Sequence, residues 1–443
     1  MSSKSKKSQF QLAKGMRDIL PEEQAYWSWL KKGVNALALN YSFSPIDTPV
    51  LEFTNLFKRT VGETTDIVSK EMYSLVTEGG DRLSLRPENT AGVVRSYIEH
   101  GMINQPQPVK LFYIAPQFRH DNPQAGRYRQ FWQFGFEVIG EKDPVIDAQL
   151  VIMSHNFLVD LGLEVEVQIN SVGDSACRPA YSKVLKKYYQ ESRRDLCADC
   201  QDRLLTNPLR LLDCKNKKCQ ELAERAPQIV DYLCEDCKNH FMSVLDYLDD
   251  VDIKYNLNSK IVRGLDYYTK TAWEVVEAGL SGKANTLGGG GRYDDLVELL
   301  GGRPAGAVGF AMGLERIIAR LQEKHISPEK EKNQEIFVAQ LGTEARKRAL
   351  QLIEDLRRDG LQISEGLSKR SLKDQLEIAD KRQVKYSLIL GQKEIADGTI
   401  LIRDMESGTQ ETVDFKKTKN EIRKRLNHQA AKSLKIKIKP EKS

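Results

Sequence analysis

The hydrophobic pattern changes its period along the chain. Residues 109–118 and 128–140 are rich in aromatic and β-branched side chains, and the turn-prone segment 121–126 separates them. This pattern predicts an antiparallel strand pair. In the second strand, a period of two places Gln133 and Glu137 on one face and aromatic side chains on the other. The polar face is typical either of a binding site or of a sheet surface in water, and the pattern leaves both open.

Strand-like sequence returns after a helix-prone stretch. Residues 172–250 have a helical pattern, whereas residues 253–276 again favour strands and lead to the glycine run 288–291. We therefore expect one sheet that an inserted module interrupts. Residues 314–321 place four apolar side chains on one helical face, with Arg316 in the first turn.

A second folding unit is expected near the C-terminus. The polar and charged segment 327–333 has the composition of a linker. Beyond it, residues 334–426 alternate strand, helix, strand, helix and strand, which is typical of a small α/β domain with parallel strand pairs.

Composition excludes several broad classes of protein. The chain has 443 residues, of which 40% are hydrophobic and 29% are charged, and these values are typical of a folded protein of more than one domain. No run of 18 or more apolar residues is present, so the sequence predicts no membrane-spanning helix. We expect a soluble, cytoplasmic protein.

The charge is unevenly distributed. The net charge is +5, yet residues 416–443 carry eleven lysines and arginines against two glutamates, and residues 1–14 carry four lysines. The body between these tails is mildly acidic. Basic tails suit a polyanionic partner such as RNA, but charge alone equally allows solvated tails that bind nothing.

Six of the seven cysteines lie between Cys197 and Cys237, in two C-x2-C pairs and one C-x4-C pair. The spacing within each pair fits tetrahedral zinc. We expect a structural Zn²⁺ whose ligands are the two outer pairs, Cys197, Cys200, Cys234 and Cys237. Free reduced thiols and redox chemistry stay open as alternatives. Cys177 is expected to be a buried thiol without a nearby partner.

Five segments carry a resemblance to a known family. FRHDNPQAGRYRQFWQFGFEVIG at 118–140 resembles motif 2 of class II aminoacyl-tRNA synthetases, IDTPVLE at 46–52 resembles motif 1, and AVGFAMGLERI at 307–317 resembles motif 3. RGLDYYT at 263–269 and GGGGRYDDL at 288–296 are similar to the two histidine-specific motifs of the histidyl-tRNA synthetase family.

The resemblance implies an α+β fold, in which a class II antiparallel catalytic sheet with flanking helices and a mostly helical insertion precedes a small α/β anticodon-binding domain. It implies ATP-dependent activation of L-histidine to histidyl-adenylate with Mg²⁺, transfer to the 3′ end of the histidine tRNA, and a homodimer. The expected layout is a basic tail at 1–14, a catalytic domain at 15–326 with the insertion at 172–250, a linker at 327–333, the anticodon-binding domain at 334–426 and a basic tail at 427–443.

Three arginines acquire roles from the resemblance. Arg119 is expected to bind the α-phosphate of ATP and Arg316 the γ-phosphate, through guanidinium forks that match phosphate oxygens. Arg263 is expected to stabilise the charge that develops as the adenylate forms. Arg119 and Arg263 are thus the expected catalytic residues.

The resemblance also implies a histidine-binding site. Glu88 and Thr90 are expected to receive the α-amino group of histidine, and Gln133 to contact its α groups. Glu137 and Tyr268 are expected to recognise the imidazole.

Two further tyrosines, Tyr267 and Tyr293, are expected to line the same pocket. Two positions depart from the family pattern, since Asn89 and Asp295 stand where glycine is usual. Neither replaces a residue with an expected contact, so these departures concern the local backbone.

A binding or regulatory relative is the competing class. The histidine-sensing regulatory subunit of ATP phosphoribosyltransferase shares the catalytic fold, but it normally lacks the C-terminal domain and need not keep both phosphate arginines. A histidine-binding pseudoenzyme that still docks RNA also stays open at this point.

Overall fold

The computed structural model describes residues 10–63, 65–122, 126–262, 264–279, 285–329 and 335–437, with the side chains of 428–437 left aside. The chain divides into two compact units, Met1–Pro328 and Glu329–Ser443. Within the described ranges, no helix is long and apolar enough to cross a membrane.

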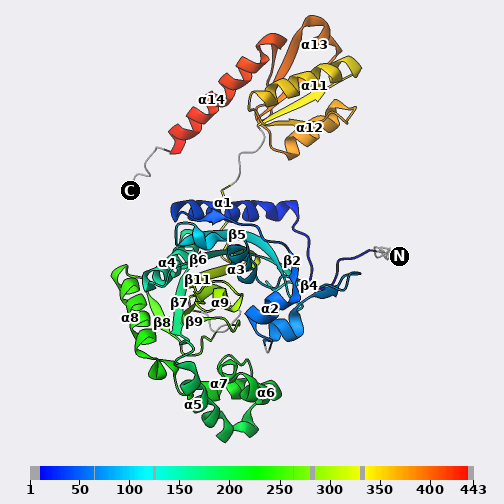
Figure 1. Cartoon of the computed structure of the whole chain (residues 1–443). Coiled ribbons are helices and arrows are strands. Elements are labelled where there is room, and N and C mark those ends of the chain that lie inside the picture. The colour runs from blue at the N-terminus through cyan, green and yellow to red at the C-terminus, as the bar shows by residue number, and fades with distance from the viewer. Residues whose placement is uncertain are drawn as a thin grey trace, which may run out of the picture. The chain divides into compact units, whose positions relative to one another are not determined.

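An eight-stranded sheet forms the centre of the first unit (Figure 1). Its strands are β1 (Ser44–Pro45), β5 (Val109–Phe118), β6 (Gln130–Ile139), β7 (Val165–Ser171), β8 (Tyr255–Leu257), β9 (Thr269–Glu277), β10 (Thr286–Arg292) and β11 (Ala307–Gly313). Their order is β1-β5-β6-β11-β10-β9-β7-β8, antiparallel except for the parallel pairs at the two edges. The predicted antiparallel pair is confirmed as β5 and β6, with Val109 opposite Ile139.

One face of this sheet packs into the main hydrophobic core. Phe134 and Phe136 of β6 and Phe310 of β11 meet Trp27 there. The helices that cover this face are α1 (Gln24–Asn40), α4 (Pro144–Asp160), α8 (Glu235–Asp250) and α10 (Leu314–Glu323). The predicted apolar stripe of α10 is confirmed, since its four members are all buried: Leu314, Ile317, Ile318 and Leu321.

The opposite face of the sheet is lined by small and polar residues. Glu137 of β6, Gly309 of β11 and Gly291 of β10 are neighbours in one cross-strand row. A Cβ atom on Gly309 would overlap the Glu137 carboxylate, and one on Gly135 would overlap the Tyr113 ring. Glycine is therefore required at these positions, and the central strands carry a floor without side chains on this face.

Further elements surround this second face. They are the helices α2 (Thr54–Val61), α3 (Thr90–Glu99) and α9 (Leu296–Leu299), the short helices η2 (Ile67–Glu71) and η3 (Met102–Asn104), and the strands β2 (Leu51–Phe53), β3 (Ser74–Val76) and β4 (Arg82–Leu85). The short helix η1 (Pro21–Glu23) instead leads directly into α1. The three strands form a separate small sheet in the order β2-β4-β3.

The chain leaves the large sheet after β7 and rejoins it at β8, which confirms the predicted interruption. Between them lie α5 (Arg178–Glu191), η4 (Arg193–Asp195), α6 (Ala198–Thr206), η5 (Pro208–Leu211), α7 (Lys217–Glu224), η6 (Ile229–Tyr232) and α8. Side chains of α5, α6 and η5, such as Tyr181, Leu204 and Leu211, build a core of their own. By contrast, α8 buries Phe241 and Val244 in the core of the sheet.

The second unit has the predicted alternation of strands and helices. Its elements are β12 (Ile336–Gln340), α11 (Thr343–Arg358), β13 (Ile363–Glu365), α12 (Leu372–Lys381), β14 (Tyr386–Leu390), α13 (Gln392–Asp397), β15 (Thr399–Asp404), β16 (Gln410–Asp414), η8 (Phe415–Lys417) and α14 (Thr418–Lys437). β12 pairs in parallel with β13 and β14, as predicted. The antiparallel strands β15 and β16 complete a five-stranded sheet and were not anticipated.

A buried ion pair joins three elements of the first unit. Arg292 of β10 donates from Nε to both carboxylate oxygens of Asp147 on α4, at 3.1 and 3.0 Å. His240 of α8 lies 3.2 Å from the same carboxylate. Arg292 also donates to the Glu141 carbonyl at 2.9 Å. Although burial opposes ionisation of Asp147, Arg292 and His240 together hold its pKa below the usual value.

We expect Asp147→Ala to lower the free energy of unfolding of the first unit by up to about 3–5 kcal/mol, because buried Arg292 loses the carboxylate that accepts from its Nε and keeps only Asp294 as an ionic partner. Thermal and denaturant unfolding of the full chain measure this change. Asp160→Ala, at the exposed end of the same helix, is the matched control. Equal stability of the two variants would contradict the assignment of Asp147 as a core ion-pair partner.

Candidate active site

Two connected cavities lie on the glycine-lined face of the large sheet. The outer cavity has a volume of about 750 Å³ and the inner cavity about 280 Å³. They share walls that include Arg119, Gln133 and Arg316, so they form one continuous pocket with two compartments.

A buried carboxyl group lies at the end of the inner cavity. Glu137 accepts a hydrogen bond from the Thr90 hydroxyl at 2.8 Å and another from the Tyr293 hydroxyl, and the Tyr113 hydroxyl lies 3.4 Å away. Burial raises the pKa of Glu137 to about 8, although the Tyr293 and Thr90 donors favour the ionised form. A ligand N–H that donates to this carboxyl would further favour its ionised form.

Three tyrosines form the walls of the inner cavity. The ring centroids of Tyr267 and Tyr268 are 4.7 Å apart, and those of Tyr267 and Tyr293 are 5.6 Å apart. All three side chains are buried. Burial raises the pKa of the Tyr293 hydroxyl, and the neighbouring Glu137 adds to this shift. A small planar ring with polar edges suits a cavity of this shape and chemistry.

The N-terminus of α3 supplies a second carboxylate. Glu88 accepts hydrogen bonds from the backbone N–H groups of Thr90 at 2.7 Å and Ala91 at 2.9 Å. Burial raises the pKa of Glu88, and these two N–H donors oppose the shift. Glu88 thus lies in the inner cavity at the start of a helix, in position to meet a cationic ligand group.

The two departures from the family pattern have different surroundings. Asn89 is buried in the wall of the inner cavity, where its side-chain oxygen accepts a hydrogen bond from the Thr48 hydroxyl at 3.0 Å. Its Nδ2 has no partner among the described residues. Asp295 is exposed at the start of α9. Glu88 and Thr90 still share one cavity wall beside Asn89.

Arg119 enters the outer cavity from the end of β5. Its Nε donates to the Pro87 carbonyl at 2.8 Å, and its guanidinium lies over the Phe131 ring, 5.3 Å from the centroid. Burial lowers the pKa of Arg119, while the negative charges of Glu71 and Glu88 oppose that shift. The side chain is therefore held in one position with guanidinium donors facing the cavity.

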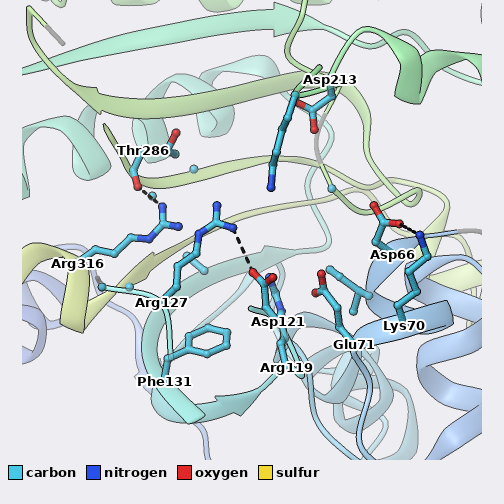
Figure 2. A pocket seen from close by; sticks show the side chains of 18 of the residues that line it. Asp66, Lys70, Glu71, Arg119, Asp121, Arg127, Phe131, Asp213, Thr286 and Arg316 are labelled. Atoms are coloured by element: carbon cyan, nitrogen blue, oxygen red, sulfur yellow. Dashed lines mark hydrogen bonds and ion pairs between the residues drawn. The ribbon is translucent and has the colours of Figure 1, made fainter. Parts of the chain in front are cut away.

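Arg316 approaches from the first turn of α10. Its Nη1 donates to the Thr286 carbonyl at 2.6 Å. Figure 2 shows Arg316, Arg127 and Arg119 gathered around the same space. Burial lowers the pKa of Arg316 to about 10, and repulsion from Arg127 and Arg119 adds to this effect. Because these three guanidinium groups are partly desolvated and repel one another, they favour an anionic ligand with several charges.

The inserted module contributes a wall of the outer cavity. Asp213, Lys215 and Asn216 line the cavity opposite Arg127 and Arg316, and Figure 2 shows Asp213 on that side. Arg203 donates to the Asp66 carboxylate at 2.7 Å and so joins the module to η2. Sequence reasoning missed these residues, because only the fold brings residues 203–216 to the motif 2 strands.

Most predicted site residues thus come together. Those lining the two compartments are Glu88, Thr90, Arg119, Gln133, Glu137, Tyr267, Tyr268, Tyr293 and Arg316. Arg263 lies outside the described residues. Arg127, Tyr113 and Asn89 are further lining residues that were not singled out as contacts, although Arg127 lies inside motif 2 and Asn89 was noted as a departure from the family pattern.

The predicted zinc ligand set is wrong. Cys197 and Cys200 cluster with Cys214 and Cys219, whereas the pair at 234–237 clusters with Asp174 and Cys177. The reason is packing: the first pair opens α6 in the core of the module, and the second opens α8, which packs on the sheet. The expectation for Cys177 is also wrong, because its sulfur lies 3.8 Å from that of Cys237.

Comparison with known families and proteins agrees with this geometry. The family model described as histidyl-tRNA synthetase matches residues 15–317, and the model described as anticodon binding domain matches residues 335–425. A histidine–tRNA ligase of Dehalococcoides mccartyi is 44% identical over 418 residues, which cover 94% of this chain and 100% of that protein. One of Pelotomaculum thermopropionicum is 45% identical over 401 residues, 90% of this chain and 94% of the relative.

A solved structure extends the likeness to three dimensions. The apo crystal structure of the histidyl-tRNA synthetase of S. aureus aligns with a TM-score of 0.78 at 36% sequence identity. The alignment covers 93% of this chain and 99% of the crystallised one. The class II fold expected from the motifs is therefore confirmed.

The raised pKa of Glu137 predicts a pH-dependent stability. Between its ordinary value of 4.5 and about 8, the folded chain binds the Glu137 proton more tightly than the unfolded chain does. The free energy of unfolding therefore falls as the pH rises through this window. Glu137→Gln removes that contribution, so the melting temperature of the variant minus that of the parent should increase by a few degrees from about pH 5 to about pH 8.

Thermal melts of parent and variant without ligands measure this difference. Glu78→Gln, at an exposed carboxyl, controls for the loss of one acidic group. A Glu137→Gln difference that stays constant with pH would show that Glu137 ionises as easily in the folded chain as in the unfolded one.

Proposed function

We propose that this chain, which belongs to the histidyl-tRNA synthetase family, activates L-histidine with ATP in the two-compartment pocket. It then transfers the histidyl group to the 3′ end of the histidine tRNA. Histidine would occupy the inner cavity and the phosphates of ATP the outer cavity. The observation that carries this proposal is the direct contact of a tyrosine-walled, carboxyl-ended cavity with a cavity lined by five arginines, of which Arg119, Arg127 and Arg316 lie on the walls shared by both cavities.

Recognition of histidine follows from the groups in the inner cavity. Glu88 would receive the α-ammonium group, and Thr90, beside Glu88, would complete this site. Glu137 would accept a hydrogen bond from an imidazole N–H, with Tyr268 and Tyr293 beside it. Because Glu137 is buried, an amino acid without such a donor leaves the carboxylate with only its hydroxyl donors, such as Thr90 and Tyr293, and sites built to bind a ligand N–H reject analogues strongly.

Adenylate formation needs positioning and positive charge. The histidine carboxylate attacks the α-phosphorus of ATP, a P–O bond forms, and pyrophosphate leaves with the electrons of the broken P–O bond. Gln133 lies on the shared wall and would orient the carboxylate. Arg119 would bind the α-phosphate and Arg316 the leaving phosphates, so that charge is stabilised where it develops. The resemblance gives Arg263 the same task.

The family reaction uses ATP as its magnesium complex. Mg²⁺ prefers oxygen ligands and commonly combines one or two carboxylates with substrate phosphates. Glu274 of β9 lies in the inner cavity wall, and its carboxylate accepts a hydrogen bond from the Thr286 hydroxyl at 3.1 Å, near Arg316. These residues fit such partial ligation, with Glu274 as the protein ligand. When bound, Mg²⁺ would neutralise phosphate charge together with the arginines.

The second unit would read the anticodon of the tRNA. It matches the anticodon-binding model over residues 335–425, and its last described helix, α14, is rich in lysine and arginine. Lysines and arginines contribute most of the phosphate affinity of nucleic-acid-binding proteins. We place the reaction in the cytoplasm, where ATP and tRNA are present and thiols stay reduced.

A homodimer is supported by an exposed apolar surface next to motif 1. On one face of the small sheet, Phe53 of β2 is 62% exposed and Leu75 of β3 is 42% exposed, and the register places them on either side of Leu83, with exposed Leu51 on the same face. Contiguous apolar side chains of this kind mark association sites. We propose that a second copy of this chain covers this surface.

The function is tested by histidine-dependent exchange of pyrophosphate into ATP. We expect Arg316→Ala to lower kcat/KM for ATP by about 10- to 100-fold, since charge-assisted contacts contribute about 1.5–3 kcal/mol, while the KM for histidine stays within about twofold. Arg320→Ala, on the same helix but paired with Glu277, is the matched control. A parent chain without histidine-dependent exchange would refute the function, and an Arg316→Ala variant equal to Arg320→Ala would refute the phosphate site.

The dimer is tested by light scattering of the purified chain. Phe53→Asp should convert the dimer to a monomer, because a carboxylate buried in an apolar interface has no partner. Leu257→Asp, at the 65% exposed Leu257 of the sheet edge strand β8, should leave the dimer intact. A dimer that survives Phe53→Asp would place the interface elsewhere.

A further inference from the structure

We propose that the inserted module binds Zn²⁺ through four thiolates, those of Cys197, Cys200, Cys214 and Cys219. The four sulfurs all lie within 4.8 Å of one another. The sulfurs of Cys197 and Cys214 are 3.7 Å apart. A tetrahedron with Zn–S bonds of about 2.3 Å has edges of about 3.8 Å, so this spacing is that of two ligands on one zinc ion.

The backbone around the cluster is arranged for thiolates. The N–H of Cys197 points to the Cys219 sulfur at 3.4 Å, and the N–H of Asn216 points to the Cys214 sulfur at 3.4 Å. Cys197 is the N-cap of α6, and Cys200 lies in its first turn. Backbone donors and a helix N-terminus both stabilise negative charge on sulfur.

The alternatives account for fewer of these observations. One disulfide would use only two of the four sulfurs, and all four cysteines are free thiols in the structure. Free thiols that act as small hydrophobic groups need not converge on one point, since other apolar side chains fill a core equally well. Three of the four residues are buried, and Cys197 is the partly exposed one. A single Zn²⁺ uses all four sulfurs.

We infer a second, independent zinc site at Asp174, Cys177, Cys234 and Cys237. The Asp174 carboxylate lies 3.3 Å from the Cys177 sulfur and 3.9 Å from the Cys234 sulfur, and the sulfurs of Cys177 and Cys237 are 3.8 Å apart. These distances again match the edges of a zinc tetrahedron, in which oxygen and sulfur ligands combine.

The two sites have the same local design. Cys234 has φ −66° and ψ 162° at the N-cap of α8, and Cys197 has φ −65° and ψ 162° at the N-cap of α6. Each C-x2-C pair therefore opens a helix with nearly the same backbone. All seven cysteines of the chain belong to one cluster or the other.

Each zinc site connects separate segments of the inserted module. The Asp174 site joins the loop that follows β7 to the start of α8, which is where the chain enters and leaves the module. The four-cysteine site joins the start of α6 to the loop and helix at 214–219, next to the outer cavity that Cys197 and Cys214 line. Neither inference depends on the proposed reaction.

Elemental analysis of the full-length chain, purified under reducing conditions without chelator, tests both sites. We expect two zinc ions per chain. Cys214→Ser and Cys237→Ser should each retain one. The controls Asp199→Asn and Asp236→Asn change exposed carboxylates inside the two C-x2-C turns and should retain both.

Each other result refutes a defined part of the proposal. Zinc-free protein in which all seven thiols react would refute both sites. One zinc that Cys237→Ser keeps and Cys214→Ser loses would uphold the four-cysteine site and refute the second, and the reverse result would do the opposite. If a variant fails to fold, X-ray absorption of the parent decides, since the two sites together give an average of about 3.5 sulfur and 0.5 oxygen neighbours per zinc.

Discussion

The pocket depends on the absence of side chains at the centre of the large sheet. Gly309 and Gly291 continue the cross-strand row that begins at Glu137, and a Cβ at either position would overlap Glu137 or Tyr268. On the other face, Phe310 and Met312 pack into the core. In an ordinary buried strand, side chains occupy both faces of the sheet. Here glycines leave one face without side chains, so a carboxyl can be buried beside a cavity and still be reached by a ligand.

This arrangement separates two electrostatic tasks within one continuous pocket. The inner compartment holds Glu88 and Glu137, which suit the cationic and N–H groups of an amino acid, and Arg119, Arg127 and Arg316 lie on the walls that it shares with the outer compartment. The negative charges of Glu71 and Glu88 stabilise the charged form of Arg119. The sheet and its loops hold all of these side chains before a ligand arrives, so reorganisation during the reaction is small.

Sequence patterns predicted the elements better than their partners. The period of two in β6 identified the face that carries Gln133 and Glu137, because side-chain direction is a local property of a strand. It did not decide between a site and a wet surface, since Tyr268 and Tyr293, which cover that face, are more than a hundred residues away. Only the resemblance to the family assigned these tyrosines to the same site as Gln133 and Glu137. The C-x2-C spacing likewise identified thiol pairs, but which pairs meet depends on the core against which α6 and α8 pack.

The inserted module completes the outer cavity through contacts of unequal strength. On the cavity side, the module meets η2 through ion pairs such as Lys70 with Asp199, whose side chains are 62% and 65% exposed. Exposed pairs of this kind contribute about 0–1 kcal/mol. On the far side, α8 buries Phe241 and Val244 in the core of the sheet, and each such side chain contributes about 1.5–3 kcal/mol. Apolar packing at α8 therefore anchors the module. The position of the cavity wall at Asp213 depends on how rigidly the module connects α8 to the loop that carries Asp213.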